Sequence, residues 1–169
     1  MLEPMLLFLD VDGTLLPFGG PGPYPEYDGP LADASALHPL LTRVDPALGP
    51  RLAGLGCELV WATTWMDEAN TSLAPWLGLP QLPSVDWPDD DAIRAERLHW
   101  KTAPLTAWAA GRPFVWVDDE IGDADRAWVA AHYPGPALLH RVDHRTGLTD
   151  ADFGVLEGWI SGLGGTAGR

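Results

Sequence analysis

The sequence predicts an α/β protein with a doubly wound, mostly parallel sheet of about five strands and helices on both faces. Two observations lead to this prediction. Short apolar runs alternate along the chain with segments of helical pattern, and this alternation is typical of parallel sheets. Polar residues such as Asp10, Thr63 and Asp118 directly follow apolar runs. Open α/β sheets bind ligands at the edge where their strands end, so these residues mark a candidate site.

The predicted strands are short, apolar and bounded by polar or turn residues. They cover residues 5–9, 58–62, 82–85, 113–117 and 137–142. The predicted helices carry a start signal or an amphipathic pattern, and they cover residues 46–54, 67–77, 92–110, 123–131 and 150–163. Asp45 is the expected N-cap of the first helix, and Thr149 or Asp150 that of the last. Pro75 is expected to end or bend the second helix, and Pro104 to interrupt the third.

The remaining segments are expected to be loops around one Rossmann-like domain. Residues 17–36 are rich in Pro and Gly without a period, which indicates a loop or a flap. Residues 86–91 form an acidic, solvated loop. We find no internal repeat and no second-domain boundary, and 169 residues suit one domain. The predicted domain covers residues 1–163, and residues 164–169 are expected to form a flexible tail.

The composition limits the classes of partner. A formal charge of −14 disfavours a nucleic-acid groove, because Lys and Arg bind phosphate backbones, although ten basic residues could still form a local patch. Cys57 is the only cysteine, so no disulfide framework or thiolate zinc site is expected. The apolar run at residues 5–9 is too short to span a membrane and lacks a signal-peptide leader. The expectation is a cytoplasmic protein without membrane partners, either a monomer or a weak homodimer.

The segment Asp10-Val-Asp12-Gly13-Thr14 carries the strongest chemical signal. Two carboxylates two residues apart, just past a strand, can both reach one ion or one phosphoryl group. Gly13 lets the chain turn sharply there. The alternative interpretation is a polar strand-to-loop turn, in which Asp and Gly are common.

This segment and three later ones resemble the motifs of haloacid-dehalogenase-like (HAD-like) phosphatases. The first motif is DVDGT, the second ends a strand at Thr63, the third contains Lys101, and the fourth is the pair Asp118-Asp119. All four occur in the family's order within residues 5–125. The resemblance implies a HAD-like fold, a bound Mg²⁺ and hydrolysis of a phosphate monoester.

The resemblance also implies roles for the acidic residues of the first motif. Asp10 would bind Mg²⁺ through one oxygen and attack phosphorus with the other, which gives an aspartyl-phosphate. Asp12 would protonate the leaving oxygen and then activate water, and its backbone carbonyl would be a further metal ligand. Gly13 would lie beside the phosphate.

The other motifs would bind the phosphoryl group and the metal. Thr63 would hydrogen-bond the phosphoryl oxygens, with Thr64 as the competing choice, and Lys101 would offset the charge of phosphate and Asp10. Asp118 and Asp119 belong to the metal site, with Asp119 the direct ligand and Asp118 the partner of Lys101. Asp123, four residues after Asp119, would support the metal ligands, or it would simply be a helix N-cap.

Other functions use similar residues. The motif order argues against a receiver domain, because the acidic pair of a receiver domain ends the first strand, whereas here the pair comes late. A phosphotransferase or phosphomutase would share every residue named above and differ only in the final acceptor. A non-catalytic interaction module is the alternative from another class. The histidines have no metal-ligand spacing and are interpreted as surface or structural residues.

The substrate is the least defined part of the prediction. The intervals between motifs leave no room for a full cap domain, so the site is expected to be open. By resemblance, open relatives act on large substrates such as protein or nucleic-acid ends, and the sequence is also similar to HAD-like domains of RNA-repair proteins. A small phosphorylated metabolite is the other candidate, with residues 17–36 as its lid.

Overall fold

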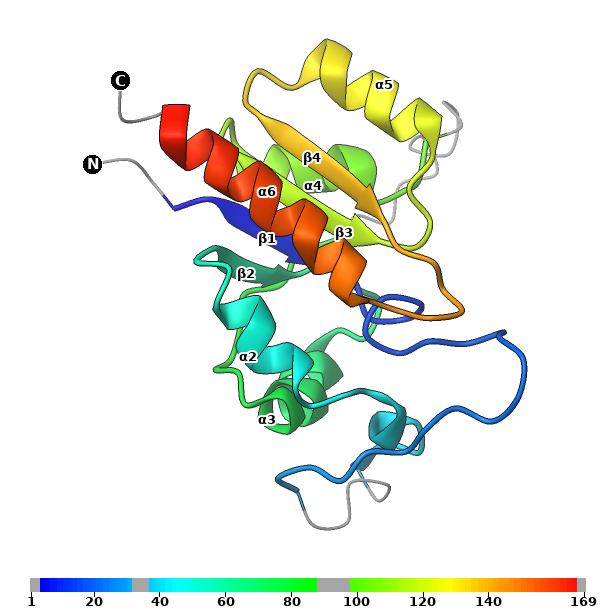
Figure 1. The fold of residues 1–169 in the computed structure, drawn as a ribbon. Coiled ribbons are helices and arrows are strands. Elements are labelled where there is room, and N and C mark those ends of the chain that lie inside the picture. The colour runs from blue at the N-terminus through cyan, green and yellow to red at the C-terminus, as the bar shows by residue number, and fades with distance from the viewer. Residues whose placement is uncertain (1–3, 32–36, 88–97, 167–169) are drawn as a thin grey trace.

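The computed structural model describes residues 4–31, 37–87 and 98–166, and these residues surround one parallel sheet (Figure 1). Its strands are β1 (Leu6–Leu9), β2 (Glu58–Trp61), β3 (Phe114–Asp118) and β4 (Ala137–Arg141). They lie in the order β2-β1-β3-β4, and each neighbouring pair is parallel. The predicted α/β class with a parallel sheet is therefore confirmed.

The order of the strands places a crevice at the ends of β1 and β3. From β1 the chain crosses to β2 on one side of the sheet, and it later returns to β3 on the other side. Leu9 of β1 is level with Trp61 of β2 and with Val117 of β3. The residues that follow β1 and β3 consequently emerge side by side where the strand order reverses, which is where open α/β sheets bind ligands.

In the part of the chain that the structure describes, the sheet has four strands, where about five were predicted. The predicted strand at residues 82–85 makes only one isolated bridge, between Ser84 and Trp61 of β2. The carbonyl of Pro83 accepts the N–H of Trp61 at 2.8 Å, and the N–H of Val85 donates to the carbonyl of Trp61 at 3.0 Å. Proline has no N–H and cannot continue a ladder, so the prolines around this segment limit it to a bridge.

The helices are α2 (Leu48–Ala53), α3 (Ala74–Leu77), α4 (Thr102–Ala109), α5 (Asp123–His132) and α6 (Asp150–Thr166). A short 3-10 helix, η1 (Leu41–Arg43), was not predicted, and a π-helical turn, η2 (Ala69–Leu73), occupies the middle of the helix predicted at 67–77. Helix α6 extends three residues beyond its predicted end, into the predicted tail.

Two prolines that were expected to disturb helices lie in the first turn of a helix. Pro75 stands in the first turn of α3, where its missing N–H costs nothing. Pro104 likewise lies in the first turn of α4, which begins at Thr102, so Lys101 directly precedes this helix instead of lying inside it. The first part of the predicted helix, residues 92–97, and most of the predicted acidic loop lie outside the described residues. Helix α2 begins after Ala47, while Asp45 accepts the Ala47 N–H at 2.9 Å.

Helices cover both faces of the sheet. Leu7 and Leu9 of β1 belong to the core beneath α2, α3 and α6, and the alternate residues Leu6 and Phe8 belong to the core beneath α4 and α5. In Figure 1, α6 crosses in front of the sheet and α4 lies behind it. The central strands β1 and β3 are fully buried between these layers, which explains their apolar sequences. The edge strand β4 is only partly buried and ends in His140 and Arg141.

The segment 17–31 is a loop tied to the rest of the chain by hydrogen bonds. The Phe18 N–H donates to the carbonyl of His144, and the Tyr27 N–H donates to the carbonyl of Thr42, each at 2.8 Å. The Tyr24 hydroxyl donates to the carbonyl of Arg145 at 2.9 Å. Residues 32–36 of the predicted flap lie outside the described residues. Among the described helices, none has the length and hydropathy required to cross a membrane.

Candidate active site

Three carboxylates meet at the carboxyl edge of the sheet. Asp10 directly follows β1, and its N–H donates to the carbonyl of Val117 in β3 at 3.1 Å, which joins the ends of the two strands. Asp118 is the last residue of β3, and Asp119 follows it. One side-chain oxygen from each of Asp10, Asp118 and Asp119 lies within 4.8 Å of the others. We call these three residues the acidic cluster.

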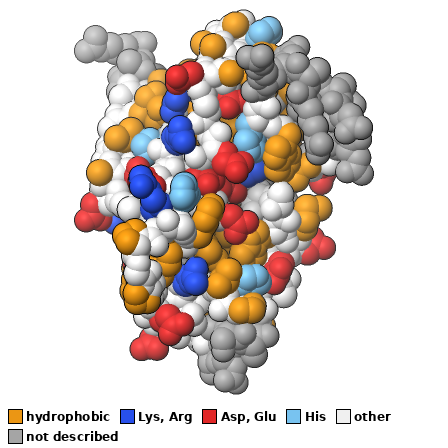
Figure 2. Space-filling model, turned by 90° about the vertical axis from the view of Figure 1, so that its right-hand side faces the viewer, with side chains coloured by type: hydrophobic (Ala, Val, Ile, Leu, Met, Phe, Trp, Pro, Cys, Tyr) orange, Lys and Arg blue, Asp and Glu red, His pale blue; other side chains and the backbone are white. Residues whose placement is uncertain are grey.

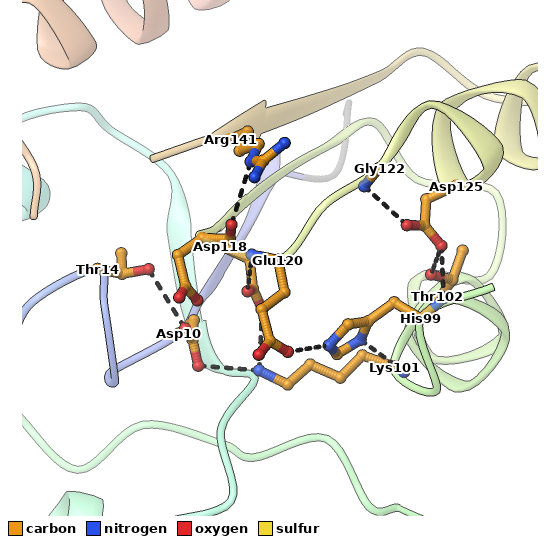
Figure 3. A network of polar contacts seen from close by, with 11 residues as sticks. Asp10, Thr14, His99, Lys101, Thr102, Asp118, Glu120, Gly122, Asp125 and Arg141 are labelled. Atoms are coloured by element: carbon orange, nitrogen blue, oxygen red, sulfur yellow. Dashed lines mark hydrogen bonds and ion pairs between the residues drawn. The ribbon is translucent and has the colours of Figure 1, made fainter. Parts of the chain in front are cut away.

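Lys101 is the only lysine of the chain, and its ammonium group reaches into the acidic cluster (Figure 3). Nζ donates to Asp10 Oδ1 at 2.8 Å and to Asp118 Oδ2 at 2.9 Å. Lys101 is 4% exposed, Asp10 5% and Asp118 1%. Buried charges are costly unless opposite charges contact them, so Lys101 makes the burial of the two aspartates possible. One ammonium still faces three carboxylates.

The excess of negative charge affects the titration of the cluster. Burial raises the pKa of Asp10 from 3.8 to about 8, and the charge of Asp118 adds to the rise, although Lys101 opposes it. Burial, followed by contact with Asp118, raises the pKa of Asp119 from 3.8 to about 6. Burial alone would lower the pKa of Lys101, but Asp10 and Asp118 outweigh it and raise the value. Asp10 therefore keeps its proton near neutral pH unless another cation neutralises the cluster.

We expect the metal-free protein to lose stability as the pH rises from about 4 to about 8. The folded-state pKa of Asp10 lies above its unfolded value, so its stabilising contribution is complete below the unfolded pKa and is lost as the pH passes through the folded pKa. The free energy of unfolding, measured by urea titration in EDTA, should fall by more than about 1 kcal/mol. Asp10→Asn should remove most of this fall. Asp67→Asn makes an equal charge change at an exposed position and should leave the fall unchanged. If wild type and Asp10→Asn showed the same pH dependence of stability, the buried environment of Asp10 would be contradicted.

The acidic cluster fits a hard divalent cation. Its donors are carboxylate oxygens, which Mg²⁺ prefers, and they converge from two strand ends. Gly13 allows the turn after β1 to pack against the cluster. It has a φ of +80°, and a Cβ atom at this position would overlap the side chain of Asp119. A glycine is thus required both for the turn and for the close approach of Asp119.

Gly13→Ala is expected to displace Asp119 and to weaken Mg²⁺ binding roughly 10–100-fold, as loss of a residue that orients a metal ligand commonly does. Isothermal titration calorimetry with Mg²⁺ measures this affinity. Gly56→Ala is the matched control, because Gly56 has a φ of +77° and open space around it. An equal loss of affinity in both variants would mean that backbone strain, and not the contact with Asp119, explains the effect.

Asp12 lies at the mouth of the site. Its side chain is exposed, and Oδ1 accepts a hydrogen bond from the indole Nε1 of Trp65 at 3.2 Å. The Trp65 ring in turn packs on the ring of His38, with centroids 4.4 Å apart. The two aspartates of the first motif therefore differ in environment, since Asp10 is buried against Lys101 whereas Asp12 is open to solvent and held by an indole.

The two threonines after β2 also differ. Thr63 is buried, and its Oγ1 accepts the N–H of Trp65 at 3.2 Å, while its carbonyl accepts Nε1 of Trp87 at 3.0 Å. The hydroxyl of Thr63 keeps its own proton for donation. Thr64 is exposed and lines the cavity at the site. Both threonines thus remain candidates for contact with a phosphoryl group.

A cavity of about 220 Å³ opens above the acidic cluster. Residues of all four motifs line it, together with aromatic and acidic neighbours: Asp10, Asp12, Phe18, Thr64, Trp100, Lys101, Asp118, Asp119 and Glu120. We call it the catalytic cavity. It is large enough for a phosphoryl group and part of the group that carries it.

Asp125 holds the segment that carries Lys101, and the sequence analysis missed it. Its buried carboxylate accepts the His99 N–H at 2.8 Å and the Thr102 hydroxyl at 2.7 Å, on either side of Lys101. The other carboxylate oxygen accepts the Gly122 N–H at 2.9 Å at the start of α5 (Figure 3). Asp125 thus joins two separate segments and fixes the position from which Lys101 extends.

Asp123 does not take the predicted place near the metal ligands. Its side chain is fully exposed and pairs with Arg126 at 3.1 Å. Gly122 is the N-cap of α5, so Asp123 is not the N-cap either. In the described part of the chain, it is Asp125 that reaches the residues around the site, because the third position of a helix can turn its carboxylate back toward the N-cap.

Two other residues orient the central side chains. Thr14 donates from Oγ1 to Asp10 Oδ2 at 3.3 Å, which fixes the second oxygen of that carboxylate. His99 Nδ1 accepts the Lys101 N–H at 3.2 Å, so the proton of the neutral ring lies on Nε2, which contacts Glu120 at 2.7 Å. His99 thus links the segment before α4 to Glu120 at the edge of the site.

A parallel sheet with a buried lysine between strand-end aspartates is the arrangement that the resemblance to HAD-like domains implied. The chain matches the family described as "HAD domain in Swiss Army Knife RNA repair proteins" over residues 6–153, and it belongs to this family. No curated protein and no solved structure matches the chain. The predicted HAD-like fold and the similarity to domains of RNA-repair proteins are confirmed.

Proposed function

We propose that this protein is a Mg²⁺-dependent phosphatase that hydrolyses a phosphate monoester through an aspartyl-phosphate on Asp10. The observation that supports this most is the pairing of Lys101 with Asp10 and Asp118 at the base of the catalytic cavity. A buried cluster with excess negative charge is unfavourable for stability alone, and such clusters concentrate at functional sites. This argues against a non-catalytic interaction module.

Asp10 and Asp119 would hold the ion through their side chains, with the backbone carbonyl of Asp12 as a further donor and Asp118 as the partner of Lys101. When bound, Mg²⁺ neutralises the negative charge that otherwise keeps a phosphate ester away from a carboxylate nucleophile. Lys101 would offset charge that develops on the phosphoryl oxygens. Thr63 or Thr64 would donate a hydrogen bond to one of these oxygens.

The reaction would proceed in two displacements at phosphorus. In the first, one Asp10 oxygen forms a bond to phosphorus while the bond to the ester oxygen breaks, and Asp12 gives its proton to the departing oxygen. In the second, Asp12 takes a proton from water, the water oxygen attacks phosphorus, and the bond to Asp10 breaks. Phosphate leaves and Asp10 is regenerated. The exposed position of Asp12 at the cavity mouth suits exchange of protons with the leaving group and with water.

The end of a nucleic-acid strand is the substrate class that we favour. The family's description names RNA-repair proteins, and a cavity bordered by aromatic side chains suits a phosphate attached to a nucleoside. A small phosphorylated metabolite is the second candidate. Transfer of the phosphoryl group to another acceptor than water would use the same residues and is the alternative reaction.

A panel of phosphorylated compounds tests the proposed function. It should include an aryl phosphate, nucleoside 3′- and 5′-monophosphates and end-phosphorylated oligonucleotides, each assayed with Mg²⁺ and with EDTA. We expect release of inorganic phosphate only with Mg²⁺, and Asp10→Asn serves as the blank. Transfer to an added alcohol in place of release would favour the phosphotransferase, and no turnover of any compound would contradict both.

A further inference from the structure

A second hollow, of about 380 Å³, adjoins the catalytic cavity. It shares Asp119 with that cavity and is otherwise lined by the consecutive residues 141–145, which lead from the end of β4 toward α6. Figure 2 looks onto this face of the molecule, where Lys or Arg and His side chains lie beside a central group of acidic ones. We call the hollow lined by Asp119 and residues 141–145 the basic hollow.

Two basic side chains of this hollow contact residues that line the catalytic cavity. Arg141 donates from Nε to the backbone carbonyl of Asp119 at 3.3 Å (Figure 3). His144 Nδ1 lies 2.9 Å from the carbonyl of Phe18, and the two rings stack with centroids 4.8 Å apart. Since Phe18 also lines the catalytic cavity, the two hollows have common walls.

Arg145 is positioned by several contacts. Its guanidinium donates to both carboxylate oxygens of Asp143, at 3.1 and 3.2 Å, and its carbonyl accepts the hydroxyl of Tyr24 at 2.9 Å. The Tyr24 hydroxyl also accepts the N–H of Gly20 at 2.7 Å. The segment that carries the basic side chains is therefore held in place by the loop at 17–31.

The charge distribution makes this segment unusual. The chain has a formal charge of −14 and only ten Lys and Arg residues, yet two arginines and a histidine occur within residues 141–145 beside the acidic cluster. Asp143 of the same segment pairs with Arg145, so Arg141 is the arginine that can meet a ligand. Arg141 is exposed, and its hydrogen bond to Asp119 uses Nε, so the fork of its two NH₂ groups can donate to a ligand. Such a fork matches two oxygens of a phosphate. The guanidinium of Arg141 at the mouth would also attract an anionic substrate toward a site that is itself acidic.

We propose that the basic hollow binds a second phosphate group of the substrate while the first lies in the catalytic cavity. This inference rests on the proposed phosphatase function and adds a requirement to it, namely a substrate with two neighbouring phosphates. Arg141 makes the principal contact, and His144 and Arg145 border it. The second phosphate belongs either to a small bisphosphate or to the adjacent phosphodiester of a strand end.

Binding to Asp12→Asn protein loaded with Mg²⁺ tests this proposal, because this variant is expected to keep metal binding and to turn over slowly. Calorimetry would compare adenosine 3′,5′-bisphosphate with adenosine 3′-monophosphate and 5′-monophosphate. We expect the bisphosphate to bind at least about tenfold more tightly than either monophosphate. The 3′-phosphorylated dinucleotide ApAp forms the second arm, and its preference over the bisphosphate would identify a strand end as the source of the second phosphate.

When Arg141→Ala is added to the Asp12→Asn protein, most of the preference for the bisphosphate over the monophosphates should be lost. Arg141→Lys in its place should keep part of this preference. Arg126→Ala is the matched control, because Arg126 is also exposed and also donates from Nε to a backbone carbonyl, that of Leu139 at 3.4 Å. It should leave the preference intact. Equal affinity for bisphosphate and monophosphates, no binding of the bisphosphate, or equal losses in the Arg141 and Arg126 variants would overturn the second site.

The same experiment separates this inference from the proposed function. If wild-type protein hydrolyses monophosphates but shows no preference for two phosphates, the basic hollow is not a binding site and the phosphatase stands. If the preference depends on Arg141 but wild-type protein turns over no phosphate ester, the hollow binds phosphate and the proposed reaction is wrong.

Discussion

Replacing Asp10 with asparagine is expected to abolish turnover and to leave no detectable aspartyl-phosphate. The amide lacks the attacking oxygen, and it also weakens the metal site, so we expect a loss of roughly four orders of magnitude or more in kcat. The fold should persist, because the amide oxygen of an asparagine can still accept from Lys101 and its NH₂ group can donate to the hydroxyl of Thr14. Rapid-quench experiments with an aryl phosphate measure both turnover and the covalent intermediate.

Asp12→Asn is the matched comparison, since it makes the same change two residues away. Its side chain is exposed, and the expected metal contact is through its backbone, so Mg²⁺ binding should largely remain. The defect should lie in departure of the leaving group and in hydrolysis of the intermediate, which lowers kcat more than it raises KM. Asp10→Asn with substantial turnover, or a greater loss in metal affinity for Asp12→Asn than for Asp10→Asn, would contradict the assignment of the two roles.

Lys101→Met is expected to produce the second-largest effect. Without the ammonium group, kcat should fall by a factor of order 10² or more. The metal-free protein should also lose about 3–5 kcal/mol of stability, because Asp10 and Asp118 would remain buried without their common partner. Mg²⁺ should restore part of this stability by neutralising the same carboxylates. Steady-state kinetics and urea unfolding with and without Mg²⁺ measure the two effects.

Two further measurements make the role of Lys101 testable even if that variant folds poorly. Lys101→Arg keeps the charge but replaces a compact ammonium with a wide planar group, so it should not restore kcat. In wild-type protein, the resonance of ¹³C-labelled lysine is unambiguous because Lys101 is the only lysine. Its pKa in the metal-free protein should lie above the usual 10.5. Full activity of Lys101→Arg, or a Lys101 pKa below 10.5 in the metal-free protein, would contradict the contacts of Lys101 with Asp10 and Asp118.

The parts of the site that follow strand ends could be predicted from sequence. An apolar run that stops at Asp10, and another that leads into Asp118, fix the edge of the sheet at which these residues emerge. The parallel register then brings them together without any need for detailed packing. Lys101 is different, because its place in the site followed from the resemblance to a family and not from a strand end. The presence of nine arginines and a single lysine was a compositional signal that could have supported it.

Other parts depended on contacts that sequence patterns do not encode. Asp125 was missed because its partners His99 and Thr102 lie more than twenty residues earlier in the chain. Asp123 was preferred because of its spacing, but the direction of the helix turns its side chain to solvent. The bridge at Ser84 was predicted as a full strand because hydrophobicity and β-propensity do not register the missing N–H groups of nearby prolines.

The central claim, that Asp10 is the nucleophile of a Mg²⁺ site, is tested most directly by a crystal structure with Mg²⁺ and beryllium fluoride, which mimics an aspartyl-phosphate. We expect the beryllium to be bound to a carboxylate oxygen of Asp10, with Lys101 and Thr63 or Thr64 donating to the fluorides. Mg²⁺ should have near-octahedral oxygen coordination at about 2.0–2.1 Å, with Asp10 and Asp119 among its ligands. Beryllium fluoride bound to another residue, or Asp10 and Asp119 pointing apart in the presence of Mg²⁺, would contradict the claim.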